Sequence, residues 1–92
     1  MQIEQLWIPL SDGVFTSSPV AKFLTGGYDE DTDSIALTVL VDGESEVEYK
    51  LNVYRSGDQV DEDAIYLGSF FEEVYQDFVH IFIIQLGSNA NT

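Results

Sequence analysis

The feature that most constrains the fold is a pair of segments in which apolar residues recur at every second position. This pattern runs through residues 35–41 and again through residues 47–53. A period of two places the apolar side chains on one face of a β-strand. An Asp-Gly dipeptide between the two segments is typical of a tight turn. We therefore predict an antiparallel hairpin over about 34–42 and 46–55.

The residues before this hairpin predict one further strand and a short helix. Residues 1–10 are rich in apolar side chains but contain Pro9, whose missing N–H confines proline to edge strands. We expect an edge-like N-terminal strand here. Residues 20–24 follow Ser18-Pro19, which places Pro19 at a first helical position, and Gly26-Gly27 would end the segment; this pattern indicates a short helix.

The C-terminal part of the chain predicts a longer helix. Ser69 and Glu72 have the spacing of a capping box, in which each side chain bonds the other residue's backbone N–H. Apolar residues then follow at intervals of three and four, as on one face of a helix. Residues 79–86 are also β-branched enough for a buried strand. Because the helical spacing continues through them, we predict one helix over about 70–86.

These elements together predict an α+β fold, in which a small antiparallel sheet packs against the C-terminal helix. A chain of 92 residues can bury one core, so we expect one domain over residues 1–87 and a disordered tail over 88–92. The chain contains no cysteine, which excludes disulfides and thiolate metal sites. We expect a protein that is neither secreted nor membrane-embedded, because residues 1–5 contain no basic side chain and no apolar stretch is long enough to span a bilayer. We expect a cytoplasmic protein, in the host cytoplasm if it is phage-encoded.

The charge balance limits the partners that this chain can bind. It has 17 acidic and 3 basic residues, for a formal net charge of −14. Such a surface repels nucleic acid and anionic lipid and attracts basic proteins. We therefore expect no direct binding of nucleic acid or membrane, and a basic nucleic-acid-binding protein or nuclease as the partner. A net charge magnitude of about 2–8 suffices for solubility, and salt adaptation is the other explanation of the excess.

The acidic residues cluster in segments around the predicted hairpin, which suggests a contact surface. Alternate residues of a strand lie about 6.7 Å apart, and each DNA strand carries one charge per ~3.4 Å. Two neighbouring acidic segments therefore approach the charge density of a phosphate backbone. An aromatic residue on the polar face of the second strand would serve as an anchor. The predicted partner-binding residues are Asp29, Asp31, Asp33, Glu44, Glu46, Glu48, Tyr54, Asp61, Glu62 and Asp63.

Catalytic and metal-binding motifs are not evident. Asp29, Asp31 and Asp33 have the spacing with which a calcium loop begins, but Ser34 and Leu40 stand where an EF-hand requires Gly and Glu. The single histidine lies in an apolar run with no paired nucleophile in the sequence. We predict no catalytic residue, no cofactor and no metal site, and hence no enzyme.

We expect a small inhibitor that occupies the nucleic-acid-binding surface of its target by DNA or RNA mimicry. In size, charge and lack of catalytic motifs the chain is similar to phage-encoded anti-CRISPR and anti-restriction proteins. The similarity includes no sequence motif, so it assigns no role to any residue of this chain. One alternative is an immunity or antitoxin protein that neutralises a basic nuclease. Another is a self-assembly module with a salt-adapted surface, which forms a homodimer through a strand edge or through Phe70, Phe71 and Phe82.

Overall fold

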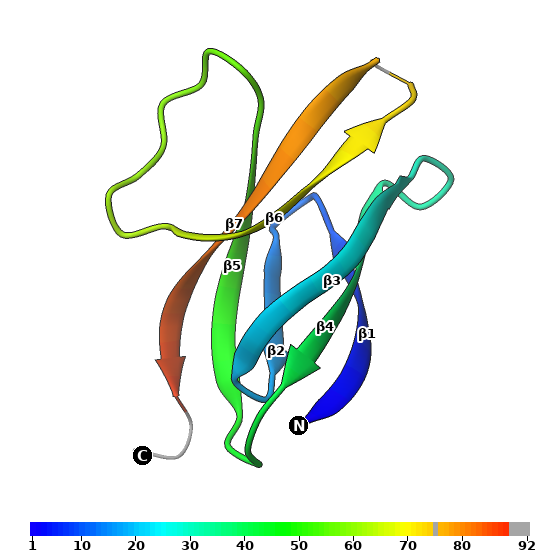
Figure 1. Cartoon of the computed structure of the whole chain (residues 1–92). Coiled ribbons are helices and arrows are strands. Elements are labelled where there is room, and N and C mark those ends of the chain that lie inside the picture. Colours follow the sequence, from blue (N-terminus) through cyan, green and yellow to red (C-terminus); the bar gives the residue numbers. More distant parts are fainter. Residues whose placement is uncertain (75, 89–92) are drawn as a thin grey trace.

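The computed structural model describes residues 1–74 and 76–88, which form two antiparallel sheets and no helix (Figure 1). The strands are β1 (Gln2–Pro9), β2 (Val14–Ser17), β3 (Val20–Asp29), β4 (Ser34–Val41), β5 (Val47–Tyr54), β6 (Ile65–Glu72) and β7 (Asp77–Ser88). One sheet has the order β1-β4-β3, and the other has the order β2-β5-β7-β6. The described part of the chain is therefore all-β, and the α+β prediction is wrong.

The predicted helix over 70–86 is replaced by a hairpin of β6 and β7. Phe70 pairs with Val79 and Phe71 with Phe78 in the register of this hairpin. Apolar residues at intervals of three and four suggested a helix here because both faces of β7 are largely apolar. No polar face therefore reveals the period of two that is typical of a strand. Val79, Ile81 and Ile83 point inward and are at most 4% exposed, and this burial in the core stabilises the strand.

The predicted hairpin over 34–42 and 46–55 is also wrong, although both of its strands exist. β4 pairs with β1 and β3, whereas β5 pairs with β2 and β7. Residues 42–46 cross from one sheet to the other, so the apolar faces of the two strands meet across the core. An alternating sequence fits either arrangement, because both bury one face of each strand.

Two further predictions concern the N-terminal part. β1 is an edge strand of its sheet and ends at Pro9, which confirms the first strand. The short helix predicted over 20–24 is wrong, because these residues belong to β3. The predicted tail begins with Ser88, which ends β7, and residues 89–92 lie outside the described residues. No helix able to cross a membrane occurs in the described ranges.

The hydrophobic core lies between the two sheets, and the sheets contact each other along the side formed by β3 and β6. Its most deeply buried side chains include Ile8, Leu37 and Ile81, which have no exposed surface. Along the side where β3 and β6 approach, Phe23 packs against Gly68, and a Cβ on this glycine would lie 2.1 Å from the ring atom Cδ1 of Phe23. This contact holds the β6–β7 hairpin beside the three-stranded sheet, and so it positions the cleft described below.

Candidate functional site

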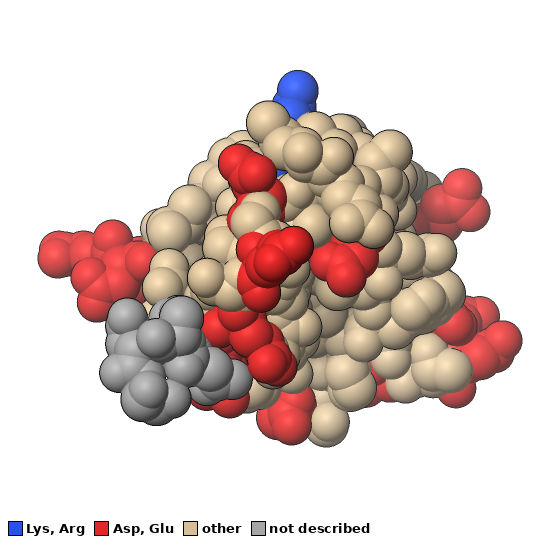
Figure 2. Space-filling model, turned by 90° about the horizontal axis from the view of Figure 1, so that it is seen from below, with Lys and Arg blue, Asp and Glu red and all other residues tan. Residues whose placement is uncertain are grey.

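The acidic residues gather at the two ends of the sandwich. Twelve of the 17 lie in or beside the four connections that leave β1, β3, β5 and β6 at one end, which we call the acidic turn end. They are Asp12, Asp29, Glu30, Asp31, Asp33, Asp58, Asp61, Glu62, Asp63, Glu72, Glu73 and Asp77. The connection between β4 and β5 carries a second, smaller group at the opposite end. Figure 2 views that opposite end, where acidic side chains form a row across the middle and others stand at the margins.

The structure divides the predicted partner-binding residues between these ends. The acids of 29–33 and 61–63 belong to the acidic turn end, in or beside the β3–β4 and β5–β6 connections. Glu44 and Glu46 lie in the opposite connection, and Glu48 follows at the start of β5. Because the molecule extends 41 Å along its longest axis, the set does not form one continuous contact surface. The acidic turn end alone brings most of it together.

Tyr54 belongs to a cluster of rings on the outer face of the four-stranded sheet. Its ring and that of Tyr66 meet Phe82 edge to face, with centroids 5.2 and 5.4 Å apart. Phe71 and Phe78 form a second such pair at 5.2 Å. These five residues are called the aromatic face, and Tyr66, Phe71 and Phe78 each remain about half exposed. The sequence signal was the alternation of aromatic residues in 78–82, which the helical interpretation obscured.

A short series of polar groups lies beside the rings of Tyr54, Tyr66 and Phe82. Ser69 Oγ lies 2.7 Å from His80 Nδ1 and 2.7 Å from the hydroxyl of Tyr66. A Ser-His pair can act in acyl transfer when the base is oriented by a third group and an oxyanion hole is present. Within the described residues, no hydrogen bond reaches the other ring nitrogen of His80. Ser69 and His80 lie directly opposite each other on β6 and β7, so their hydrogen bond links the two strands.

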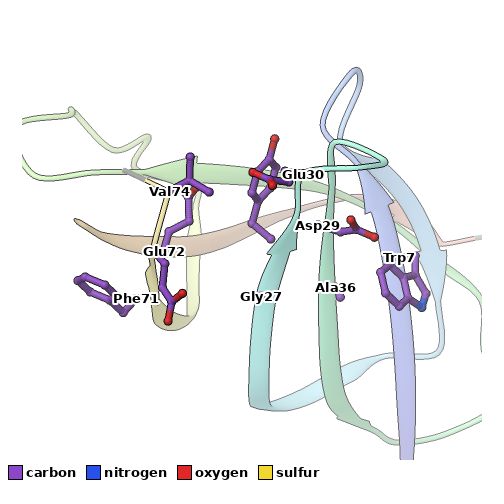
Figure 3. Close-up of a pocket in the computed structure, with 10 residues that line it drawn as sticks. Trp7, Gly27, Asp29, Glu30, Ala36, Phe71, Glu72 and Val74 are labelled. Atoms are coloured by element: carbon purple, nitrogen blue, oxygen red, sulfur yellow. The ribbon is translucent and has the colours of Figure 1, made fainter. Parts of the chain in front are cut away.

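A cleft of about 560 Å³ opens at the acidic turn end, between the β6–β7 hairpin and the three-stranded sheet. Trp7 pairs with Ala36, and Ala36 with Gly27, so the three residues form one row across the outer face of that sheet. The small residues leave a shallow floor beside the indole. Figure 3 shows Phe71, Glu72 and Val74 on the opposite wall. The remaining lining residues are Tyr28, Asp29, Glu30 and Glu73.

Glu72 is the buried charge of this site. Its side chain is 5% exposed, and Oε2 accepts a hydrogen bond from the Arg55 guanidinium at 3.1 Å. The other oxygen, Oε1, is buried and has no hydrogen-bond partner among the described residues. A buried carboxylate is costly unless its oxygens accept hydrogen bonds. Oε1 can therefore accept a further hydrogen bond from a donor that reaches it. The sequence placed Glu72 in a helix cap and did not reveal that it points inward.

A second cavity of about 230 Å³ lies behind Glu72, where the interior between the sheets opens at this end. Arg55 and Phe70 are among its lining residues, and Tyr28 and Glu72 line both cavities. The hydroxyl of Tyr28 donates to Asp33 Oδ1 at 2.7 Å. Glu72 and Tyr28 therefore form the partition between the outer cleft and the interior.

The three aspartates with calcium-loop spacing are partly engaged within their own turn. Asp29 Oδ1 accepts a hydrogen bond from the backbone N–H of Asp31 at 3.0 Å, and Asp33 accepts one from Tyr28. In residues 1–74 and 76–88 no group of three or more potential metal ligands is close enough to hold an ion. The hydrogen bonds that Asp29 and Asp33 accept thus stabilise the turn itself.

Comparisons with known proteins supply no homologue for this chain. No protein-family model matches it, and neither the curated proteins nor the solved structures include a significant match. The functional interpretation therefore depends on the geometry and charge of the molecule itself.

Proposed function

We propose that this protein is a non-catalytic binding protein whose acidic turn end docks on a basic surface of another protein. The observation that supports this proposal is the concentration of twelve of the 17 acidic residues around the connections at that end. Two of the three cations, Lys22 and Lys50, lie within strands, and the third, Arg55, bonds Glu72. The field at this end is strongly negative and steers basic partners toward it.

The class of partner proposed is a cytoplasmic nucleic-acid-binding protein. Such proteins present Lys- and Arg-lined grooves to phosphate backbones, and an acidic end that enters the groove excludes the nucleic acid. The protein then acts as an inhibitor by mimicry. An immunity or antitoxin protein that neutralises a basic nuclease uses the same electrostatics and differs in the identity of its target.

The test compares two double variants with equal changes in charge. Asp31→Lys/Asp63→Lys alters the acidic turn end, and Glu44→Lys/Glu46→Lys alters the opposite connection. Each is used as bait in lysates of the native host at low and high salt, and each captured protein is then assayed for nucleic-acid binding. We expect the wild type and the second variant to retain a nucleic-acid-binding protein at low salt, and the first variant to lose it.

The proposal also requires that the captured protein release its nucleic acid when the wild type is added. Equal capture by the two double variants, or capture that high salt does not weaken, would contradict docking through the acidic turn end. A captured nuclease whose activity is abolished would identify the immunity role.

Self-association is a second candidate function, favoured by the exposure of the aromatic face. Tyr66, Phe71 and Phe78 are 58%, 47% and 55% exposed, and aromatic residues are enriched in the centres of protein interfaces. Sedimentation at increasing concentration tests it. We expect a dimer that high salt does not dissociate and that Phe78→Ser disrupts. A monomer at all concentrations would rule this function out.

A further inference from the structure

We infer that the cleft beside Trp7 receives an arginine side chain of the basic partner. This inference rests on the proposed function, because it specifies which group of the partner the acidic turn end recognises. The cleft is the hollow in that end where aromatic and acidic side chains meet. Its volume of about 560 Å³ lies within the ~300–1,000 Å³ range of small-ligand pockets.

The lining of the cleft combines the two groups that bind a guanidinium. Trp7 is 56% exposed and borders a floor made by Ala36 and Gly27, which leaves its indole accessible for stacking. Indole rings attract cations through the negative charge of their faces. Asp29, Glu30, Glu72 and Glu73 line the same cleft and supply carboxylates. An anion would be repelled from this position by these four acids.

Glu72 gives the inference its second, independent support. The side chain is 95% buried, yet Oε1 has no hydrogen-bond partner among the described residues. Arg55 holds Oε2 at 3.1 Å and so fixes the orientation of the carboxylate. Glu72 lines the cleft as well as the inner cavity, and an N–H donor that reaches Oε1 would remove the cost of leaving this oxygen unbonded.

Arginine fits this site better than lysine does. A guanidinium is planar and weakly hydrated, so it can stack on Trp7 while its N–H groups point toward carboxylates. A guanidinium frequently binds a carboxylate through two parallel hydrogen bonds, and this bidentate geometry adds specificity. An ammonium is a compact, strongly hydrated charge that does not stack, and therefore it loses more hydration for fewer contacts here.

The only tryptophan of the chain provides the measurement. We would titrate the full chain with N-acetyl-arginine amide and follow the fluorescence of Trp7 and the NMR signal of its indole N–H. The neutral isostere N-acetyl-citrulline amide is the matched control ligand, and N-acetyl-lysine amide tests the choice of cation. We expect a saturable change with arginine, a weaker one with lysine and none with citrulline.

Two charge-matched variants locate the binding. Glu30→Gln removes a carboxylate of the cleft, and Glu44→Gln removes one at the opposite end. We expect the first to lower the arginine affinity several-fold and the second to leave it nearly unchanged. Glu72→Gln should lower the arginine affinity further. In Trp7→Ala, which lacks the indole reporter, the NMR signal of the Gly27 backbone amide reports binding. Because Glu30 is exposed, its variant tests the cleft even if Glu72→Gln does not fold.

Either of two results would overturn the inference. One is an equal response to the arginine and citrulline derivatives, and the other is an equal loss of affinity in Glu30→Gln and Glu44→Gln, which would indicate general attraction to the charge of the protein. The proposed function is tested separately by capture of a partner. If Trp7→Ala still captures that partner at wild-type strength, docking stands and the arginine site fails.

Discussion

The two sheets bury their inner faces by the same alternation but differ on their outer faces. In the middle of the three-stranded sheet, small and polar residues such as Ala36 and Thr38 face outward beside Thr25. On the four-stranded sheet the corresponding positions carry the aromatic face. Burial of the inner faces stabilises the fold, so the side chains on each outer face can differ without changing the core.

Both outer faces nevertheless place most of the charge at their ends. Like charges directly opposite each other on neighbouring strands destabilise a sheet, and among the paired residues only Glu72 and Asp77, at the end of β6 and β7, bring two acids together in this way. Connections, in contrast, expose their backbone and side chains to water. The acidic residues therefore gather at the connections, where they also bound the cleft beside Trp7. The acidic residues and the exposed aromatic residues thus occupy largely separate parts of the surface.

The largest effect is expected where the two sheets meet, at Gly68. In Gly68→Ala the new Cβ would lie 2.1 Å from Phe23 Cδ1 and 2.5 Å from Cγ, so the whole ring must move. Overpacking of this kind costs about 1–3 kcal/mol and occasionally more, and because the whole Phe23 ring is displaced we expect a loss of about 3 kcal/mol or more. Urea unfolding gives the free energy directly.

Gly87→Ala is the matched control, since a Cβ there meets nothing within 4 Å. It should be neutral or slightly stabilising, because alanine reduces the freedom of the unfolded chain. If Gly68→Ala is equally neutral, the contact between β3 and β6 does not hold the sheets together, and the position of the cleft needs another explanation.

The sequence predicted strands well where one face is apolar and the other polar. Residues 35–41 and 47–53 are strands as expected, and Pro9 marks the end of an edge strand. The same pattern does not specify the partner of a strand, so β4 and β5 could be assigned to one hairpin. Residues 78–84 are apolar on both faces, which removes the polar alternation and allows a helical interpretation.

The candidate site was predicted only in part, for a related reason. The acidic segments are local features and can be read from the chain. The cleft, in contrast, requires Trp7, Ala36 and Glu72, which come from three strands far apart in the sequence. The inward direction of Glu72 depends on its pairing with Asp77, and this register follows from the tertiary fold.

An intermediate effect is expected for the aromatic face. Phe82 contacts both Tyr54 and Tyr66 edge to face, and each aromatic pair contributes about 0.5–1.5 kcal/mol beyond its buried area. We expect Phe82→Ala to lower the free energy of unfolding by about 1–3 kcal/mol. Thr38→Ala, on the outer face of the other sheet, should change it by about 0.5 kcal/mol or less. Equal losses would show that the two outer faces contribute alike to stability.

The smallest effect concerns the repulsion within the acidic turn end. Asp31 is exposed and lies among Asp29, Glu30 and Asp33 in one connection, so Asp31→Asn should stabilise the fold by a few tenths of a kcal/mol at low salt. High salt screens the repulsion, and the gain should then vanish. Glu4→Gln removes the single acid of β1, outside the acidic turn end, and should gain less at low salt. Thermal unfolding at two salt concentrations measures all four values. Equal gains from the two variants would mean that the negative field is spread evenly, which would weaken the proposal that the acidic turn end selects the partner.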